Sequence, residues 1–369
     1  MRDFRPRRIY ALRDCLHEPL AGRVIDRLPG TPLEVIDSEE EVLEEIRATK
    51  DPVGEGKHLL LLTRQRGDYV KPCPCTPNYL GCNYFIINAD TNCPMDCSYC
   101  ILQTYLSNPL VTIHVNSDRM REQLDAFLRA NPRPLRIGTG ELGDSLVLDH
   151  LTDRSRDLIS YFRGKMSAFF ELKTKTTNIA NILNEKPDDN IIIAWSLNAP
   201  AAAQAEEKGA PSVSDRIAAA RDVSRHGFRV AFHFDPLLHC PGWKEGYAAV
   251  IEELLSSVES DQIAWISLGA LRFPPSLKQA LRERFPQSRI LLEEFIQGMD
   301  GKFRYFKPLR MELFDWVVKN FRLNWKGKGK RELPLYLCME SRENWNKILG
   351  EKIKGKEDVE RHLTLPLIT

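Results

Sequence analysis

The stretch Thr91–Leu102 reads TNCPMDCSYCIL and places three cysteines within eight residues. Cys93, Cys97 and Cys100 follow the spacing Cys-x3-Cys-x2-Cys. A cysteine-bound four-iron four-sulfur (4Fe-4S) cluster normally takes four thiolates, so three thiolates leave one iron open to another ligand. The spacing therefore predicts a 4Fe-4S cluster with an open iron on this segment, which we call the cysteine loop.

Zinc and disulfides are the alternative uses of these cysteines. Structural zinc takes four ligands, usually as two pairs, and Cys73, Cys75 and Cys82 could complete such a set. The nine cysteines are an odd number, and the first ten residues, MRDFRPRRIY, lack the apolar run of a signal peptide. We expect reduced thiols in a cytoplasmic protein and structural roles for Cys73, Cys75 and Cys82.

The composition is that of an ordinary globular protein. Of 369 residues, 43% are apolar and 28% are charged, and no apolar run approaches the roughly 18 residues of a membrane span. The net charge is only +1, but Lys302–Lys356 holds 15 Lys or Arg against 6 Asp or Glu. Such a basic segment could contact nucleic acid, and a solvated lysine-rich surface explains it equally well.

The first 83 residues predict a small lead domain. Leu33–Ile36 and Leu59–Leu62 are apolar enough for strands. Ser38 followed by Glu41 forms a capping box that opens a helix through Arg47.

From Tyr84 onward, strand-length apolar runs alternate with helical segments. This alternation predicts a parallel sheet. Ser214 is the expected cap of one helix, with Gly227 at its end. The predicted strands are Phe85–Asn88, Leu135–Ile137, Ala168–Leu172, Ile191–Leu197, Phe228–Phe234 and Ile263–Leu268, and the predicted helices are Arg119–Arg129, Asp153–Phe162, Ile179–Asn184, Asp215–His226, Lys244–Val258 and Ser276–Arg284.

A cysteine loop directly after the first strand resembles the radical S-adenosylmethionine (SAM) enzymes. The resemblance implies an α/β fold: a partial (β/α)6 TIM-type barrel at 84–288, with a small N-terminal domain at 1–83 and an irregular, basic C-terminal extension at 289–369. In these enzymes SAM binds the open iron, and reduction of the cluster cleaves SAM to a 5′-deoxyadenosyl radical. The resemblance also implies an electron donor such as flavodoxin or ferredoxin.

Candidate SAM-binding residues stand in the cysteine loop and after the second strand. Tyr99 lies between the last two cysteines, where a tyrosine ring can pack on the SAM adenine or serve only as packing. The second strand ends in GTGE, Gly138 to Glu141, where small residues let backbone approach a cofactor. Glu141 is the first candidate for the SAM ammonium group, and Asp144 is the alternative.

The next two strands end in further candidates. Lys175 closes the third strand, and Ser196 and Asn198 close the fourth. A lysine and a small hydroxyl or amide aimed into a barrel mouth could hold the carboxylate and ribose of SAM. Strand alternation also allows one residue of each pair, such as Lys173 or Lys175, to point outward.

The order of KPCP, GCNY, NCPMDCSYCILQ, LKTK, WSLN, GW-x2-GY and GKFRY narrows the resemblance, over Pro72 to Tyr305, to the spore photoproduct lyases. Enzymes of that family abstract hydrogen from a methylene-linked thymine dimer in DNA and return two thymines. The resemblance thus implies a DNA-repair lyase with DNA as its partner. It assigns Lys302, Arg304 and Tyr305 to a lesion-facing turn.

One departure from that family concerns the end of the reaction. Spore photoproduct lyases carry a hydrogen-donating cysteine after the second strand, and that place here falls at or beside Glu141. No cysteine stands between Cys100 and Cys240. Cys240, just beyond the fifth strand, is therefore our candidate thiol donor and Tyr99 the next, with Tyr305 and Cys338 as further alternatives; an ordinary loop cysteine is the competing interpretation of Cys240.

Two other functions stay open. The same radical chemistry could act on a small molecule or a peptide, which the missing cysteine and the near-neutral charge favour. A zinc-stabilised DNA-binding protein without catalysis is the third hypothesis. In each case we expect a monomer that does not enter a membrane.

Overall fold

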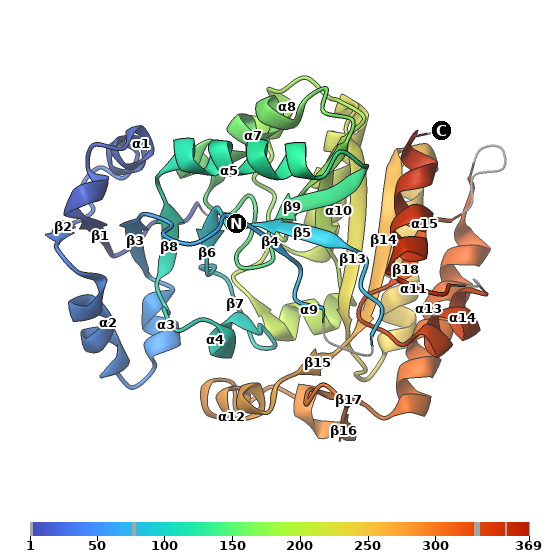
Figure 1. Ribbon diagram of the computed structural model, residues 1–369. Helices are drawn as coiled ribbons and strands as arrows, with labels where there is room; N and C mark the ends of the chain where they lie inside the picture. The colour runs from blue at the N-terminus through green and yellow to red at the C-terminus, as the bar shows by residue number, and fades with distance from the viewer. Residues whose placement is uncertain (1–2, 76–78, 328–332, 351–352, 369) are drawn as a thin grey trace.

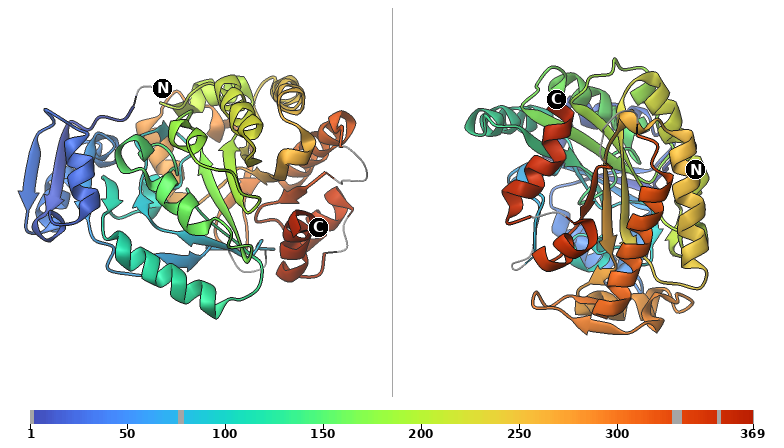
Figure 2. Two further views of the ribbon diagram at one scale, coloured as in Figure 1. Left: turned by 90° about the horizontal axis from the view of Figure 1, so that it is seen from above. Right: turned by 90° about the vertical axis from the view of Figure 1, so that its right-hand side faces the viewer.

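A computed structural model describes residues 3–75, 79–327, 333–350 and 353–368. A small sheet near the N-terminus and a large, curled sheet organise the chain (Figure 1). The N-terminal sheet and the C-terminal helices lie on opposite sides of the curled sheet (Figure 2). Lys328 and Lys330 of the basic segment lie outside the described residues.

The small sheet has the strand order β2-β1-β3-β8-β6. Both predicted strands of the lead domain are confirmed, and Ser38 Oγ accepts a 3.2 Å hydrogen bond from Glu40 N to cap α2. The elements are β1 (Arg8–Leu12), β2 (Leu33–Ile36), β3 (Leu59–Thr63), β6 (Asp90–Thr91), β8 (Val111–His114), η1 (Arg13–Cys15), α1 (Pro19–Asp26), α2 (Glu39–Arg47) and α3 (Pro52–Gly56).

Two strands of this sheet come from beyond residue 83. β8 pairs in parallel with β3, and β6 pairs antiparallel with β8. β8 was not predicted, because VTIH alternates apolar and polar residues over only four positions, although all four are buried. The chain therefore enters the large sheet at β4 and β5, returns to the small sheet at β6 and β8, and enters the large sheet again at β9.

The large sheet has the order β18-β14-β13-β11-β10-β9-β5-β4. All six strands predicted from Tyr84 onward are present and parallel, with ends shifted by a few residues. The C-terminal segment adds one more parallel strand, and β4 pairs antiparallel with β5. The strands are β4 (Val70–Pro72), β5 (Tyr84–Ile87), β9 (Leu135–Thr139), β10 (Ala168–Thr174), β11 (Ile191–Ser196), β13 (Arg229–Leu237), β14 (Ile263–Ala270) and β18 (Leu335–Leu337).

The curled sheet is an open barrel whose edge strands are β4 and β18. The segment between β4 and β5 reaches the end of β18, where Leu80 N donates a 2.9 Å hydrogen bond to the Glu340 carbonyl. The parallel part is therefore a partial barrel, which agrees with the predicted architecture.

Helices connect the strands of the large sheet. The prediction of Ser214 as a cap was wrong, because Ser212 Oγ accepts the 3.1 Å hydrogen bond from Asp215 N and Ser214 lies inside α10; Gly227 ends that helix as predicted. The helices are α4 (Leu102–Tyr105), α5 (Ser117–Ala130), α6 (Asp149–Thr152), α7 (Arg154–Phe162), α8 (Ala180–Leu183), α9 (Pro200–Glu206), α10 (Val213–His226), α11 (Trp243–Ser257), η2 (Ser260–Gln262), α12 (Pro275–Arg284), η3 (Ile290–Leu292), α13 (Lys307–Asn324), α14 (Arg342–Leu349) and α15 (Lys356–Ile368).

Two small sheets complete the fold. β7 (Asp96–Cys97) pairs with β12 (Glu207–Lys208), and β17 (Phe303–Tyr305) lies between β15 (Arg272–Phe273) and β16 (Phe295–Gln297). In the part of the chain that the structure describes, no helix is both long and apolar enough to cross a membrane.

The buried apolar side chains form two cores. One fills the barrel and the space between its strands and helices. The other lies on the small sheet, and it includes Cys93, Met95 and Cys97 of the cysteine loop together with Leu148 and Leu151. The cysteine loop thus packs on the N-terminal sheet while it follows a barrel strand in the chain.

Candidate active site

The cysteine loop is held on one side by a buried lysine. Lys57 is 3% exposed, and its Nζ donates hydrogen bonds to the carbonyls of Cys93 (2.9 Å) and Met95 (2.7 Å). The same ammonium lies 3.8 Å from a carboxylate oxygen of Asp96. Lys57 was not predicted as a site residue, because a lone lysine after a short helix forms no recognisable sequence pattern.

On the other side, β12 holds the loop. Glu207 and Cys97 are partners in the β7–β12 pair, and the Tyr99 hydroxyl donates a hydrogen bond to the Glu207 carboxylate. Burial raises the pKa of Tyr99, and the Glu207 charge raises it further. The Tyr99 hydroxyl is therefore bound within the protein, while its ring lies 5.8 Å from Lys175 Nζ.

The three thiols of the loop have the donor chemistry of an iron–sulfur cluster. Cys93 and Cys97 are buried and Cys100 is half-buried, and all three are free of disulfides. Burial raises the pKa of Cys97 to about 12, and the Lys175 charge acts against this rise. Among the described residues, no group of three His, Cys, Asp or Glu side chains is arranged so that it could hold a metal ion. The loop therefore supplies three candidate thiol ligands whose side chains are not arranged as a metal site.

Glu141, the predicted partner of the SAM ammonium group at the end of β9, already has a partner within the protein. The Lys173 ammonium forms an ion pair with the Glu141 carboxylate, and the Glu141 side chain is 32% exposed. A Cβ on Gly140, whose φ is +91°, would lie 2.5 Å from the Lys173 carbonyl. A Cβ on Gly138 would lie 2.2 Å from the Tyr84 hydroxyl. The small residues of GTGE thus allow close packing of neighbouring strands, which the sequence analysis had attributed to a cofactor.

Asp144, the alternative to Glu141, binds backbone. Its oxygens accept hydrogen bonds from the backbone N–H groups of Leu146 and Val147 at 3.0 Å each. They also accept hydrogen bonds from Thr174 Oγ1 and Lys175 N at 2.7 Å each. Asp144 therefore fixes the loop after β9 against the end of β10.

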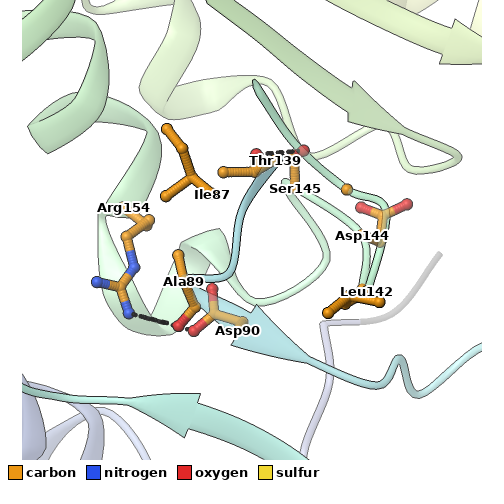
Figure 3. A pocket seen from close by; sticks show the side chains of 10 residues that line it. Ile87, Ala89, Asp90, Thr139, Leu142, Asp144, Ser145 and Arg154 are labelled. Carbon is orange, nitrogen blue, oxygen red and sulfur yellow. Dashed lines mark hydrogen bonds and ion pairs between the residues drawn. The ribbon is translucent and has the colours of Figure 1, made fainter. Parts of the chain in front are cut away.

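A small pocket beside this loop is closed by the protein's own hydrogen bonds (Figure 3). The hydroxyls of Thr139 and Ser145 lie 2.6 Å apart at one end. At the other end, Arg154 Nη2 donates a 3.2 Å hydrogen bond to Asp90. The first contact holds the loop after β9 against the end of β9, and the second joins α7 to β6 of the small sheet.

The three further candidates for SAM differ in how free their side chains are. Lys175 faces the Tyr99 ring, and Ser196 ends β11 with 9% of its surface exposed. Asn198 is 1% exposed; its Oδ1 accepts hydrogen bonds from Tyr247 Oη (2.7 Å) and Ala199 N (3.0 Å). Its Nδ2 also donates to the Pro236 carbonyl, so Asn198 orients the loops that follow β11 and β13.

Below the barrel mouth lies a buried polar layer around Glu171, for which the sequence carries no pattern. Glu171 accepts hydrogen bonds from Trp265 Nε1 (2.8 Å) and shares a 2.9 Å contact with His233 Nε2. Burial acts to raise the pKa of Glu171, but the charges of His233 and Arg136 lower it to about 2. His233 is 7% exposed, so this contact gives a buried imidazole its partner.

At the far side of the mouth, Asp235 and Arg272 form a two-pronged ion pair of 3.0 and 3.1 Å. The Arg272 Nη2 also lies 3.4 Å from Cys338 Sγ. Cys338, an alternative hydrogen donor, therefore lies beside this ion pair. A different thiol, Cys73, shares electrostatic interactions with Glu141 and Lys173.

The predicted DNA-facing turn is largely internal. Arg304 is 3% exposed, and its guanidinium pairs with Asp300 at 2.5 and 2.7 Å. Tyr305 is 1% exposed, and its hydroxyl accepts a 3.1 Å hydrogen bond from His239 N. Lys302 is half-buried, and burial lowers its pKa. Strand alternation could not reveal these partners, which come from the β16–β17 turn and from the loop after β13.

Cys240 lies in that same loop after β13. It is half-buried, and it lines a cavity of about 600 Å³ together with α9 and the segment between α12 and η3. Glu206 and Glu293 raise its pKa in addition to burial, which is the main cause. Cys240 therefore lies near the segment that contains Tyr305. Cys73 lies within electrostatic range of Glu141.

Comparison with known proteins adds independent findings. The family model described as spore photoproduct lyase matches residues 80–308. A curated spore photoproduct lyase from Geobacillus sp. (strain Y412MC61) is 26% identical over 214 residues, which cover 57% of this chain and 63% of that relative. The match therefore spans less than two thirds of the relative's length.

Solved structures share the fold. A cysteine-to-alanine mutant of spore photoproduct lyase superposes with a TM-score of 0.79 at 22% identity and covers 91% of this chain and 99% of that one. A double mutant with bound AdoMet and dinucleoside spore photoproduct gives the same TM-score and identity over 92% and 100%. The predicted fold class is confirmed by these superpositions.

Proposed function

Because the chain belongs to the spore photoproduct lyase family, we propose that it is a radical SAM enzyme, a lyase that acts on a lesion of DNA bases. One observation carries the proposal: a three-cysteine loop, held from both sides, lies beside the carboxyl ends of the parallel strands of a partial barrel. Active groups of such barrels stand at this end of the strands.

In this proposal Cys93, Cys97 and Cys100 hold a 4Fe-4S cluster. When bound, the cluster and SAM supply a 5′-deoxyadenosyl radical. The electron comes from a donor such as flavodoxin or ferredoxin, and the enzyme works as a cytoplasmic monomer.

The chain's own residues then have distinct tasks around SAM. Lys175 offers a cation to the SAM carboxylate, and Tyr99 offers a ring face to the adenine. Glu141 accepts the SAM ammonium only by sharing its carboxylate with Lys173. Ser196 offers a hydroxyl at the end of β11, whereas Asp144 and Asn198 act by positioning the surrounding loops.

The hydrogen atom that ends turnover needs a source other than a cysteine at position 141. Cys240 and Tyr99 stay our proposed donors. Cys73, whose pKa is raised by burial and influenced by the charges of Glu141 and Lys173, adds a second thiol to this set. Tyr99 would have to exchange its hydrogen bond to Glu207 in order to donate.

Anaerobic purification tests the proposal. The wild-type protein should be brown, bind about four irons per chain and cleave SAM when reduced. The C93A/C97A/C100A variant should lose the iron, and the C73A/C75A/C82A variant should keep it. A colourless wild-type protein with stoichiometric zinc and no iron would contradict this proposal and support the hypothesis of a zinc-stabilised DNA-binding protein without catalysis.

A second substrate class is favoured by one observation. Arg304 and Tyr305 are engaged inside the protein, so only Lys302 of the predicted turn offers a cation at the surface. A small molecule or a peptide would not need such a DNA-facing turn. DNA affinity that falls steeply with salt supports the first substrate class, because phosphate contacts release counterions.

A further inference from the structure

A large cavity lies outside the ring of candidate SAM residues. It has a volume of about 600 Å³, and of the candidate residues only Cys240 lines it. α9 forms one wall and the segment from α12 to η3 forms the opposite wall. Figure 1 shows α9 above α12 and β15, on the same side of the barrel as β7 and α4.

Apolar side chains line part of both walls of this cavity. Ala201, Ala202 and Ala205 present small side chains from α9, and Phe285 and Ile290 are buried in the opposite wall. Small-molecule sites are typically concave, apolar cavities of this size with a few polar groups. The cavity can therefore take a flat apolar group of the size of a nucleobase.

Two carboxylates and two cations without an ion pair among the described residues stand at the rim, and they differ in how their side chains are held. The carboxylates are engaged internally, since Glu206 accepts hydrogen bonds from Ser98 and Ser288 and Glu293 lies 2.7 Å from His239. The cations Lys208 and Arg289 are exposed, and within the described ranges neither forms an ion pair; Lys208 lies only over the Phe285 ring at 5.0 Å. These residues, in contrast to Arg304, can reach a phosphate.

The cavity is joined to the cysteine loop by backbone. Lys208 belongs to β12 and pairs with Asp96, while the preceding residue, Glu207, pairs with Cys97. The other wall leads through η3 into β16 and the hairpin with β17. Both walls of the cavity are therefore continuous along the chain with segments that flank the candidate active site: β12 with the cysteine loop, and η3 with the β16–β17 hairpin.

We propose that this cavity binds a nucleotide of the DNA strand next to the one that undergoes reaction. The base rests on the alanine face of α9, and its phosphates contact Lys208 and Arg289. The inference rests on the proposed function in taking DNA as substrate. A concave cavity with partly apolar walls favours a nucleotide over a docked redox protein, because electron-transfer encounters use small, transient contact surfaces.

Fluorescence anisotropy with labelled (dT)10, on the anaerobically purified full-length protein without added SAM, tests the base contact. Ala205 is exposed on the cavity wall, so Ala205→Trp fills the cavity without disturbing the core. Affinity should fall about tenfold, in keeping with the loss of one stacked base. Gln204→Trp adds the same ring at an exposed α9 position that does not line the cavity, and it should bind as the wild type does.

The phosphate contacts have their own readout. The K208A/R289A variant should give a shallower dependence of log affinity on log salt, by about 1.4 for two lost single-strand phosphate contacts. K50A/K186A removes two other exposed lysines and should leave the slope unchanged. Thermal melts of all variants confirm that each is folded.

Two outcomes overturn the inference. Wild-type affinity of A205W for (dT)10 would exclude the base contact. An unchanged salt slope in K208A/R289A, with slower reduction of the holoenzyme by flavodoxin, would assign the cavity to the electron donor. The binding assay needs no radical chemistry, so a failure of the proposed reaction would appear separately as absent iron or absent SAM cleavage.

Discussion

At the scale of the residue, His114 shows how burial can make stability depend on pH. It ends β8 with 8% of its surface exposed, and neither ring nitrogen has a hydrogen-bond partner among the described atoms. Burial, aided by the nearby Arg154 charge, lowers the pKa of His114 to about 4. The folded protein therefore keeps this imidazole neutral where the unfolded chain protonates it.

The sign of the effect follows from proton binding. Between the unfolded pKa of 6.5 and the folded value of about 4, the unfolded state binds the extra proton, so stability falls as pH falls. The full difference is about 3 kcal/mol. His114→Phe keeps a ring at 6.4 Å from Tyr69 and should flatten this part of the curve. Urea unfolding from pH 7.5 to 4 measures it, and equal slopes for both proteins would contradict the assignment.

At the scale of the element, the cysteine loop depends on Lys57 for its shape. Two carbonyls of the loop receive hydrogen bonds from this single buried ammonium. Lys57→Met keeps the aliphatic length but leaves both carbonyls without the donor, at a cost of about 3 kcal/mol. We expect faster amide hydrogen exchange across 93–100 and weaker iron retention.

The matched control for this variant is Lys50→Met, which changes an exposed lysine in the short segment between α2 and α3. It should leave exchange and stability unchanged. Exchange in the loop of Lys57→Met at the wild-type rate would show that β12 alone holds the loop.

Strands were predicted well from the sequence where apolar runs are long, but the partners of individual side chains were not predicted. The runs at Ile191–Leu197 and Ile263–Leu268 lie at strands that are buried along their whole length, because parallel strands in a covered sheet need apolar residues on both faces. The burial of Arg304 depends on Asp300, and that of Tyr305 on a backbone N–H of another loop. Such contacts depend on tertiary packing, which a single sequence does not display.

At the scale of the whole molecule, one hydrophobic core stabilises the N-terminal sheet and the other stabilises the barrel. Leu61 and Leu268 are both fully buried, one in each core. Either one changed to alanine should cost about 2 to 5 kcal/mol. Only Leu61→Ala should also speed hydrogen exchange across 93–100, because its core contains Cys93 and Cys97. Equal exchange in the two variants would show that the cores are not independent.

The position of the second core along the chain bears on how the protein is made. Every buried member of that core lies at or before Leu151, whereas the barrel core extends to Leu367. Ribosomes deliver the N-terminal part first, and domains generally fold as units during synthesis. The cysteine loop can therefore pack on the small sheet and on Lys57 while more than half of the chain is still being translated, and β12 completes its support only after Lys208 has been made.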